Sequence, residues 1–548
     1  MVLIKAKRWL DKEEFKEILK IADYTGFENG RAIFTFNFDK ALRNGYSYED
    51  IILLIQEYDL EVDEADLEEI RDLFEKIGVE IRWDRSTGSV KLRIPWKIYY
   101  RVKEDLKAVN ARYAGKNENE IIYIILPDKI HELTDRIVSK GFNVVDKEGL
   151  LREKQLPFKP VLRNIELRDY QREALDKWVE NNYKGIIALP TGSGKTVIGI
   201  ATLTIKPVRT LIITFTREQM FQWRDSIVKY TDIEPRYIGL MYSEEKRLAP
   251  ITITTYQSGF RIINDISPYF DLLIVDEVHH LPADKFKYIA LHSIARYRMG
   301  LSATPVREDG KHEELFPLLG GIIYYKSPAE LAQKGYLARY RIQTVKIKLT
   351  REEQKEYEKL RKKYRALVGS STFQEVLEAA RKGDPYAKEA LKIHSQMRML
   401  LAKSRSKIEK AIEIAKNEFE KGNKVIIFTQ YVEQAKKISE ALNAYLLTGE
   451  IPVDERKNIL MKFKEADRGI LVVTTVGDEG LDIPDANVGI IVSGTGSRRQ
   501  FIQRLGRLLR PKKGAVEARL YEIVIVKTPE EYQSRKRKEL NLDDYLDE

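Results

Sequence analysis

The sequence predicts an α/β protein with two tandem, doubly wound parallel-sheet domains, an N-terminal α+β domain before them and a helical insertion between them. The chain has 548 residues, and at about 150 residues per domain it is too long for one compact core. Short apolar runs alternate with amphipathic segments in two separate stretches, a pattern typical of βαβ units. The stretch between them lacks strand patterns. The predicted domain ranges are 1–155, 160–345, 350–405 and 406–548.

The N-terminal region mixes strand and helix patterns. We expect a strand at 31–38, an amphipathic helical stretch at 47–78, a hairpin that turns at 86–89, a strand at 120–126 and a helix near 128–141. The residues Trp96, Tyr99, Tyr100 and Arg101 follow the hairpin. Their rings could pack in a hydrophobic core or stack on nucleic-acid bases, and both interpretations stay open.

Buried strands define the two α/β series. In the first series they are expected at 185–189, 210–215, 251–255, 271–276 and 298–304. In the second series they are expected at 424–429, 469–475, 488–493 and 519–526. Runs that are apolar throughout indicate strands covered on both faces, as in parallel sheets.

The predicted insertion consists of two helices and a third that starts near Pro385. Over 351–410 there are 16 Lys and Arg residues against 9 Asp and Glu residues. A solvated helical hairpin would explain this charge, and so would a basic prong that contacts nucleic acid. The position between two α/β domains favours the second interpretation.

Composition excludes several classes of protein. The absence of cysteine rules out disulfides and thiolate metal sites and fits a reducing cytoplasm. The six histidines form no HExxH pair, so a metal site built from imidazoles is not expected. We see no signal-peptide pattern and no run of 18 apolar residues, which favours a cytoplasmic protein with no membrane partner. The net charge of +10 hints at a polyanionic partner, and the richness in Lys and Glu resembles hyperthermophile composition.

Residues 185–196 are predicted to form a buried strand and the glycine-rich loop that follows it, and an amphipathic segment comes next. This context is what a phosphate-binding loop requires, because backbone N–H groups and a helix N-terminus must converge on phosphate oxygens. Lys195 would reach the β and γ phosphates, and Thr196 would ligate Mg²⁺. Leu189 replaces the first glycine of the usual pattern. The loop residues predicted to contact nucleotide are Thr191, Gly192, Ser193 and Gly194.

Two acidic residues end the buried run at 271–276. At the carboxyl edge of a parallel sheet, Asp276 would hold Mg²⁺ and Glu277 would act as general base on the attacking water. Capping of the next helix is the structural alternative. We prefer the chemical role because a phosphate loop precedes this pair along the chain.

An acid-free basic run lies near the end of the second series. Seven Lys and Arg residues occur between 498 and 513, and Arg504, Arg507 and Arg510 are spaced three apart along one predicted helix face. Guanidinium groups suit bidentate contact with a γ-phosphate. We therefore expect arginine fingers that complete the site when the two domains close.

These motifs, together with SAT at 302–304, occur in one order and look like those of a superfamily-two nucleic-acid helicase over residues 165–515. The resemblance implies two RecA-like motor domains that use ATP and Mg²⁺. It further implies adenine recognition by Gln171 with Arg168 nearby, strand contacts at Arg217 and Thr255, coupling of hydrolysis to domain movement at Ser302 and Thr304, nucleotide contacts at Gly480 and Asp482, and a finger motif that begins at Gln503.

A narrower resemblance rests on Arg307, Glu308 and Asp309, which directly follow SAT, and on the helical insertion. These features look like the xeroderma pigmentosum B (XPB) helicases in archaeal form. The resemblance implies 3′ to 5′ movement on DNA, a role in nucleotide excision repair, a thumb formed by the insertion, a structure-specific nuclease as partner and association with the nucleoid. The loop 476–484 has a general superfamily-two spelling, so the repair role depends on the other motifs.

Three alternatives remain open at this point. One is a translocase that migrates branches or anneals strands. Another is a DNA-distorting scaffold that uses ATP as a switch and delivers a nuclease. An RNA substrate is the third, and the DEVH spelling of residues 276–279 tilts the choice only slightly towards DNA.

Overall fold

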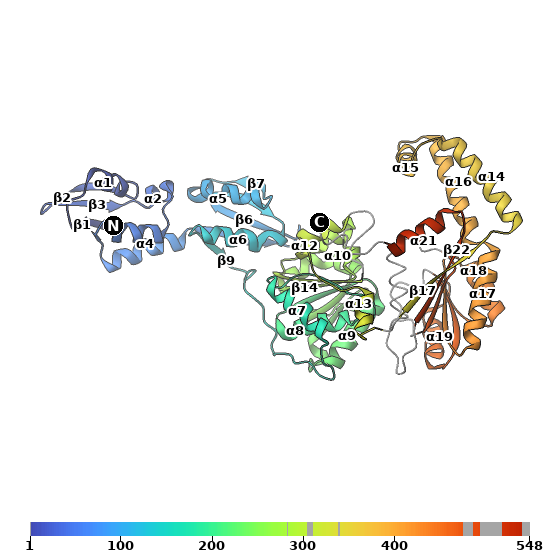
Figure 1. Cartoon of the computed structure of the whole chain (residues 1–548). Helices are drawn as coiled ribbons and strands as arrows, with labels where there is room; N and C mark the ends of the chain where they lie inside the picture. The colour runs from blue at the N-terminus through green and yellow to red at the C-terminus, as the bar shows by residue number, and fades with distance from the viewer. Residues whose placement is uncertain are drawn as a thin grey trace.

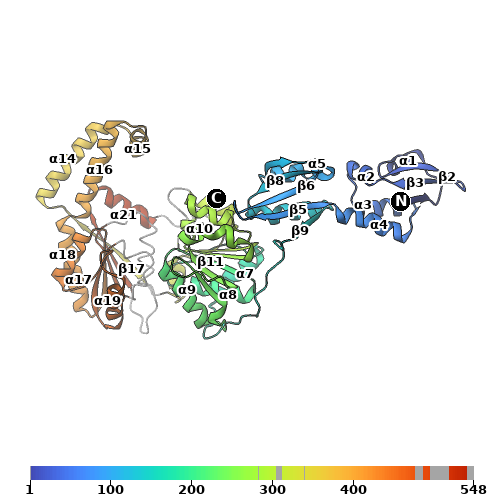
Figure 2. The ribbon, with the colours of Figure 1, turned by 180° about the vertical axis from the view of Figure 1, so that it is seen from behind.

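The computed structural model describes residues 2–281, 283–303, 311–337, 340–474, 486–493 and 518–539. The parts of the chain follow one another through the elongated molecule, with the N-terminal region at one end and the second α/β domain at the other (Figures 1 and 2). Within the described residues, no helix combines the length and apolar character needed to cross a membrane.

The N-terminal region contains two sheets rather than one. The first, of strand order β2-β3-β1-β4, is antiparallel, and the second has the order β7-β8-β6-β5-β9. One hydrophobic cluster runs through both. The first sheet and its helices comprise β1 (Leu3–Ala6), α1 (Lys12–Ile18), β2 (Ala22–Glu28), β3 (Arg31–Phe36), α2 (Phe38–Asn44), α3 (Tyr48–Glu57), β4 (Leu60–Glu61) and α4 (Glu64–Lys76). The second comprises β5 (Gly78–Asp84), β6 (Ser89–Pro95), α5 (Trp96–Ala108), β7 (Arg112–Lys116), β8 (Glu120–Ile125), α6 (Ile130–Ser139) and β9 (Asn143–Asp146).

The prediction of a single helical stretch at 47–78 is wrong in one respect, because β4 divides this stretch into α3 and α4. Asp59 adopts a left-handed conformation with φ of 49°, which ends the first helix. The hairpin prediction at 86–89 agrees with the turn between β5 and β6. Of the aromatic group, Trp96 and Tyr99 are half-buried, whereas Tyr100 is 77% exposed.

The first α/β domain is a seven-stranded sheet of order β12-β13-β11-β14-β15-β10-β16, and every pairing is parallel. Its strands are β10 (Lys184–Ala188), β11 (Thr210–Thr214), β12 (Ile238–Met241), β13 (Ile251–Thr255), β14 (Leu272–Asp276), β15 (Tyr297–Ser302) and β16 (Ile322–Tyr325). Its main helices are α7 (Asp169–Glu180), α8 (Lys195–Ile205), α9 (Arg217–Tyr230), α10 (Tyr256–Ile266), α11 (Asp284–Leu291), α12 (Leu315–Leu319) and α13 (Pro328–Gln333). The sequence prediction missed the two short edge strands, β12 and β16.

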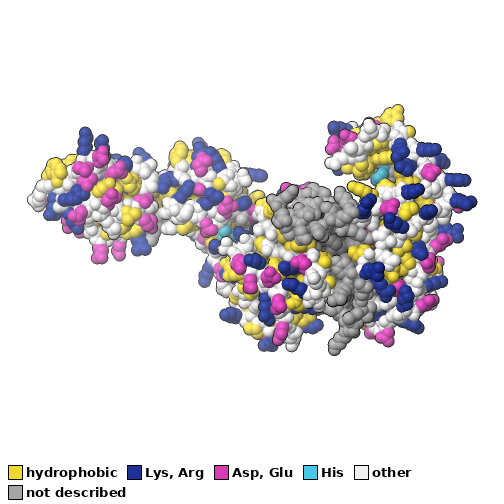
Figure 3. Space-filling view, viewed as in Figure 1, with side chains coloured by type: hydrophobic (Ala, Val, Ile, Leu, Met, Phe, Trp, Pro, Cys, Tyr) yellow, Lys and Arg dark blue, Asp and Glu magenta, His cyan; other side chains and the backbone are white. Residues whose placement is uncertain are grey.

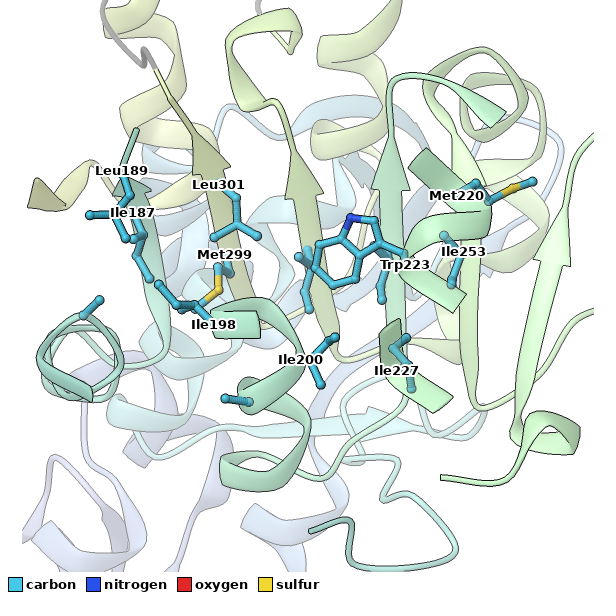
Figure 4. Close-up of a cluster of buried hydrophobic side chains, with 14 of the residues drawn as sticks. Ile187, Leu189, Ile198, Ile200, Met220, Trp223, Ile227, Ile253, Met299 and Leu301 are labelled. Carbon is cyan, nitrogen blue, oxygen red and sulfur yellow. The ribbon is translucent and has the colours of Figure 1, made fainter. Parts of the chain in front are cut away.

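Alternate residues of each central strand enter two different cores, as the two-residue period of a strand requires. Ile274 of β14 joins the cluster under α7, α8 and α9, whereas Leu273 and Val275 join the cluster under α10, α11 and α12. Figure 4 shows the first of these clusters. By the same alternation Asp276, which ends β14, lies on the α8 and α9 side of the sheet.

The second α/β domain is a six-stranded sheet of order β17-β22-β21-β18-β20-β19, again with parallel pairings only. Its strands are β17 (Tyr340–Ile347), β18 (Lys424–Thr429), β19 (Tyr445–Leu447), β20 (Gly469–Thr474), β21 (Val488–Ile491) and β22 (Ala518–Ile525), and its helices are α17 (Arg405–Glu420), α18 (Val432–Leu442), α19 (Val453–Glu465) and α21 (Pro529–Glu539). The predicted end of the first domain at 345 is wrong, because β17 pairs with β22 along its whole length.

The insertion consists of α14 (Arg351–Val368), α15 (Phe373–Arg381) and α16 (Pro385–Ala402), and it projects from the second sheet (Figure 1). Its base is anchored by a small cluster in which Tyr357, Ile393 and Met397 pack with Ile525 of β22. Because of this anchor, the insertion moves with the second domain. Lys and Arg side chains outnumber acidic ones along the outer edge of the insertion (Figure 3).

The second N-terminal sheet is bonded to the first α/β domain. His292 Nδ1 lies 2.6 Å from the carbonyl oxygen of Gly88, and His131 Nε2 lies 3.0 Å from that of Ile294. The Ile294 side chain is part of the N-terminal hydrophobic cluster. A Cβ on Gly88 would lie 2.0 Å from the side-chain oxygen of Asn264, so the two surfaces meet in close contact.

Candidate active site

The glycine-rich loop joins β10 to α8. Gly192 and Gly194 have φ angles of 84° and 81°, which favour glycine, and Gly194 is the N-cap of α8. A Cβ on Gly194 would meet the side-chain nitrogen of Gln171 at 2.6 Å. The loop backbone therefore makes a tight turn at the N-terminus of α8, and this is the geometry that binds phosphate.

Lys195 begins α8 and folds back over the loop. Its ammonium donates to the carbonyl oxygens of Leu189 at 2.9 Å and Pro190 at 3.3 Å. Burial lowers the pKa of Lys195, and the carboxylates of Glu277 and Asp276 partly oppose this shift. An anionic phosphate in the loop would favour the charged form of this lysine.

Leu189, which stands where the usual loop pattern has glycine, has a structural role. Its side chain is fully buried in the cluster under α8 (Figure 4), and its N–H donates to the carbonyl oxygen of Ser302 at 2.9 Å. The residue thus secures the start of the loop to the core and to the SAT motif.

Asp276 is held by two donors. Trp223 of α9 donates from Nε1 to Oδ2 at 2.9 Å, and the backbone N–H of Glu277 donates to Oδ1 at 3.0 Å. Burial raises the pKa of Asp276, whereas the Trp223 bond and the charge of Lys195 lower it. Tyr256 Oη donates to the Asp276 carbonyl oxygen at 3.2 Å, which holds the strand end as well.

Glu277 adopts a left-handed conformation with φ of 50° and ψ of 52°. Such a conformation is uncommon for a residue with a side chain and is frequent at functional sites. His279 is fully buried, and its Nδ1 lies 3.3 Å from Glu277 Oε2 and 3.1 Å from Ser302 Oγ. One imidazole thus links the acidic motif to the SAT motif.

The predicted Mg²⁺ ligands fit a metal that is shared with phosphates. Thr196 lies in the first turn of α8, and Asp276 ends the strand on the same side of the sheet. The described residues contain no group of three or more His, Cys, Asp or Glu that could hold a metal on their own. Mg²⁺ prefers oxygen ligands and usually keeps waters and substrate phosphates in its shell, so a hydroxyl and one carboxylate suit it.

Gln171 lies beneath the loop. Its Nε2 donates to the carbonyl oxygen of Ser193 at 3.0 Å, and its Oε1 accepts from the backbone N–H of Arg168 at 3.0 Å. Tyr170 Oη also donates to Ser193 O, at 2.6 Å. The Arg168 guanidinium donates to the carbonyl oxygen of Tyr336 at 3.1 Å and lies over that ring. These residues support the loop, while base recognition stays a prediction.

The predicted strand contacts have partners within the protein. Arg217, half-exposed at the start of α9, donates to Glu244 at 2.6 Å and to Ser243 at 2.7 Å. Thr255 is 7% exposed, and its hydroxyl accepts from the Ser258 N–H as the N-cap of α10. Ser302 is fully buried at the end of β15. A contact between DNA and Arg217 or Thr255 stays a prediction.

Several predicted residues lie outside the described part of the chain. They are Thr304, Arg307, Glu308, Asp309, Gly480, Asp482, Gln503, Arg504, Arg507 and Arg510. Sequence reasoning in turn missed Trp223, Tyr170, Tyr256 and the linking role of His279. All four lie within a few residues of a predicted site residue: Trp223 of Arg217, Tyr170 of Gln171, Tyr256 of Thr255 and His279 of Glu277. This closeness is the signal that could have identified them.

Two family models match parts of the chain. Residues 164–307 match the family described as type III restriction enzyme, res subunit, and residues 381–545 match the family described as ERCC3/RAD25/XPB C-terminal helicase. The helicase domain of Hef from Pyrococcus furiosus, a solved structure, covers 69% of this chain and is itself covered completely, with 22% identity and a TM-score of 0.49.

Curated relatives of the chain carry XPB names. The DNA 3′-5′ translocase XPB2 of Sulfurisphaera tokodaii is 42% identical over 393 residues, which are 70% of this chain and 87% of the relative. The DNA 3′-5′ helicase XPB of Kineococcus radiotolerans is 32% identical over 65% of this chain and 59% of its own length. The chain belongs to the XPB family of superfamily-two helicases.

Proposed function

We propose that this protein hydrolyses ATP to move along DNA in the 3′ to 5′ direction and that it opens or remodels DNA in nucleotide excision repair. The observation that carries the proposal is the meeting of the phosphate loop, the Asp276–Glu277 pair and Ser302 at one edge of the first sheet. The XPB relatives named as 3′-5′ translocase and helicase support the direction of movement.

Each residue has a defined part in this mechanism. The loop N–H groups bind the phosphates, and Lys195 offsets the charge that develops on the transferred phosphoryl group. Thr196 and Asp276 would hold Mg²⁺, which would supply Lewis-acid stabilisation of the charge on the phosphates. Glu277 takes a proton from the attacking water. His279 lies next to both Glu277 and Ser302 and so couples the general base to the SAT motif.

The second domain completes the mechanism. Arg507 and Arg510 of the predicted finger motif contact the γ-phosphate when the domains close. The insertion formed by α14, α15 and α16 contacts the DNA backbone as a thumb, because its outer edge is basic. We further propose a structure-specific nuclease as partner and a cytoplasmic, nucleoid-associated location.

The decisive experiment compares ATP hydrolysis with single-stranded DNA, duplex DNA, bubble DNA and RNA, and strand displacement on duplexes with a 3′ or a 5′ tail. We expect stimulation by DNA and displacement of the 3′-tailed substrate. Binding and hydrolysis without displacement would indicate a scaffold instead. Equal stimulation by RNA, or displacement from a 5′ tail alone, would contradict the proposal.

A further inference from the structure

The buried hydrogen bond between Trp223 and Asp276 has no part in the steps described above. The Trp223 side chain comes from the middle of α9 and is 1% exposed, and Nε1 lies 2.9 Å from Asp276 Oδ2. In Figure 4 the indole nitrogen points towards the arrowhead ends of the strands, where Asp276 lies. A charged acceptor makes such a bond stronger than one between neutral groups.

The indole ring is fixed in place by the helix that follows the phosphate loop. A Cβ on Gly199 of α8 would lie 2.4 Å from Trp223 Cη2 and 3.2 Å from Cζ3. The ring thus occupies the space that the missing side chain at position 199 leaves free. Because α8 and the sheet enclose the ring, its N–H has little freedom to turn away from Asp276.

The two donors together set the direction of the carboxylate. Trp223 engages one oxygen of Asp276, and the Glu277 N–H engages the other. A carboxylate has about four lone-pair positions, so each oxygen keeps one for a metal ion or a metal-bound water. Loss of the indole N–H would leave Asp276 Oδ2 without this donor and would let the carboxylate rotate.

We propose that Trp223 is a positioning residue for the metal site: its indole N–H holds the Asp276 carboxylate in the orientation that binds the divalent cation of the nucleotide complex. This inference rests on the proposed Mg²⁺ site. Partners that orient a metal ligand are worth about 10- to 100-fold in metal affinity or activity. The proposal therefore requires a loss of metal affinity without a loss of nucleotide affinity.

The test uses Trp223→Phe in the full chain, with Trp178→Phe as matched control. Trp178 is equally buried in the same cluster, and its Nε1 donates to the carbonyl oxygen of Arg298 at 2.9 Å, away from the metal site. Binding of Mn²⁺ in the presence of ADP is followed by electron paramagnetic resonance. Binding of ADP without metal is measured in parallel.

We expect Trp223→Phe to weaken Mn²⁺ binding by about tenfold or more, with metal-free ADP binding within about twofold of the unmodified protein. Trp178→Phe should leave both unchanged. If Trp223→Phe does not fold, 3-benzothienylalanine at position 223 keeps the bicyclic ring and replaces only the N–H with sulfur. Mn²⁺ affinity equal to that of the unmodified protein, in whichever of these variants folds, would overturn the inference.

A further variant separates this inference from the proposed function. Asp276→Asn should lose Mn²⁺ binding even though Trp223 is intact. If the unmodified protein bound no Mn²⁺, or if Asp276→Asn bound it normally, the metal site itself would be wrong and the inference would fall with it. If only the Trp223 variants bound normally, the metal site would stand and the positioning role alone would fail.

Discussion

Replacement of Gly199 by alanine tests the packing between α8 and α9. In a helix interior alanine is favoured over glycine by about 1 kcal/mol, so helix propensity alone predicts stabilisation. The new Cβ, however, would lie 2.4 Å from Trp223 Cη2 and 3.1 Å from Leu301 Cδ1. Overpacking of a core costs about 1–3 kcal/mol, and a rigid ring at 2.4 Å favours the upper end of that range. We expect a net destabilisation of about 2 kcal/mol.

Gly259→Ala is the matched control. Gly259 is a buried glycine inside α10, and the nearest neighbours of a Cβ there would be side-chain methyl groups at 3.3 to 3.4 Å. This change should be neutral or stabilising by up to about 1 kcal/mol. Since the chain has several domains, local stability is better read from hydrogen exchange of the β11 and β14 amides than from one melting temperature. If Gly199→Ala protected these amides as well as Gly259→Ala did, the packing argument would be refuted.

Three further predictions concern catalysis, the insertion and pH. Lys195→Ala and Glu277→Gln should each lower DNA-stimulated ATP hydrolysis by about 100-fold or more while circular dichroism stays unchanged; near-normal turnover in either variant would contradict the assigned roles. Deletion of 351–402 should weaken DNA binding and strand displacement more than basal hydrolysis, and should flatten the salt dependence of binding; equal loss of both activities would argue against a thumb. Burial lowers the pKa of His131 to about 4, so the unfolded state binds more protons between about pH 6.5 and 4, and stability should fall as pH falls through that window. His131→Asn should remove this component from the pH dependence of thermal unfolding, and an unchanged pH dependence would contradict it.

Much of the candidate site could be predicted because its signals are local in sequence. A loop such as the one around Gly194 needs glycine for its φ angle, and Lys195 and Thr196 follow it in the first helical turn. The central strands were also predictable, since fully buried parallel strands are apolar throughout. The α/β class and the two parallel sheets are confirmed.

The contacts that connect distant segments could not be predicted. Trp223 meets Asp276 across 53 positions of the chain, and no local pattern records that meeting. The strand β17 follows the first domain directly, yet its best partner is β22, which the chain reaches about 170 residues later. Thr255 stands in a motif that suggested DNA contact, and the structure uses its hydroxyl to cap α10.

Side-chain contacts fix the second N-terminal sheet to α10 of the first α/β domain. Trp83 donates to the carbonyl oxygen of Asn264 at 3.0 Å, and Arg85 pairs with Asp265 at 2.7 Å. Both partners lie in the last turns of α10, whose first turn follows Thr255. If the two α/β domains close on each other, the second N-terminal sheet must therefore move together with the first α/β domain.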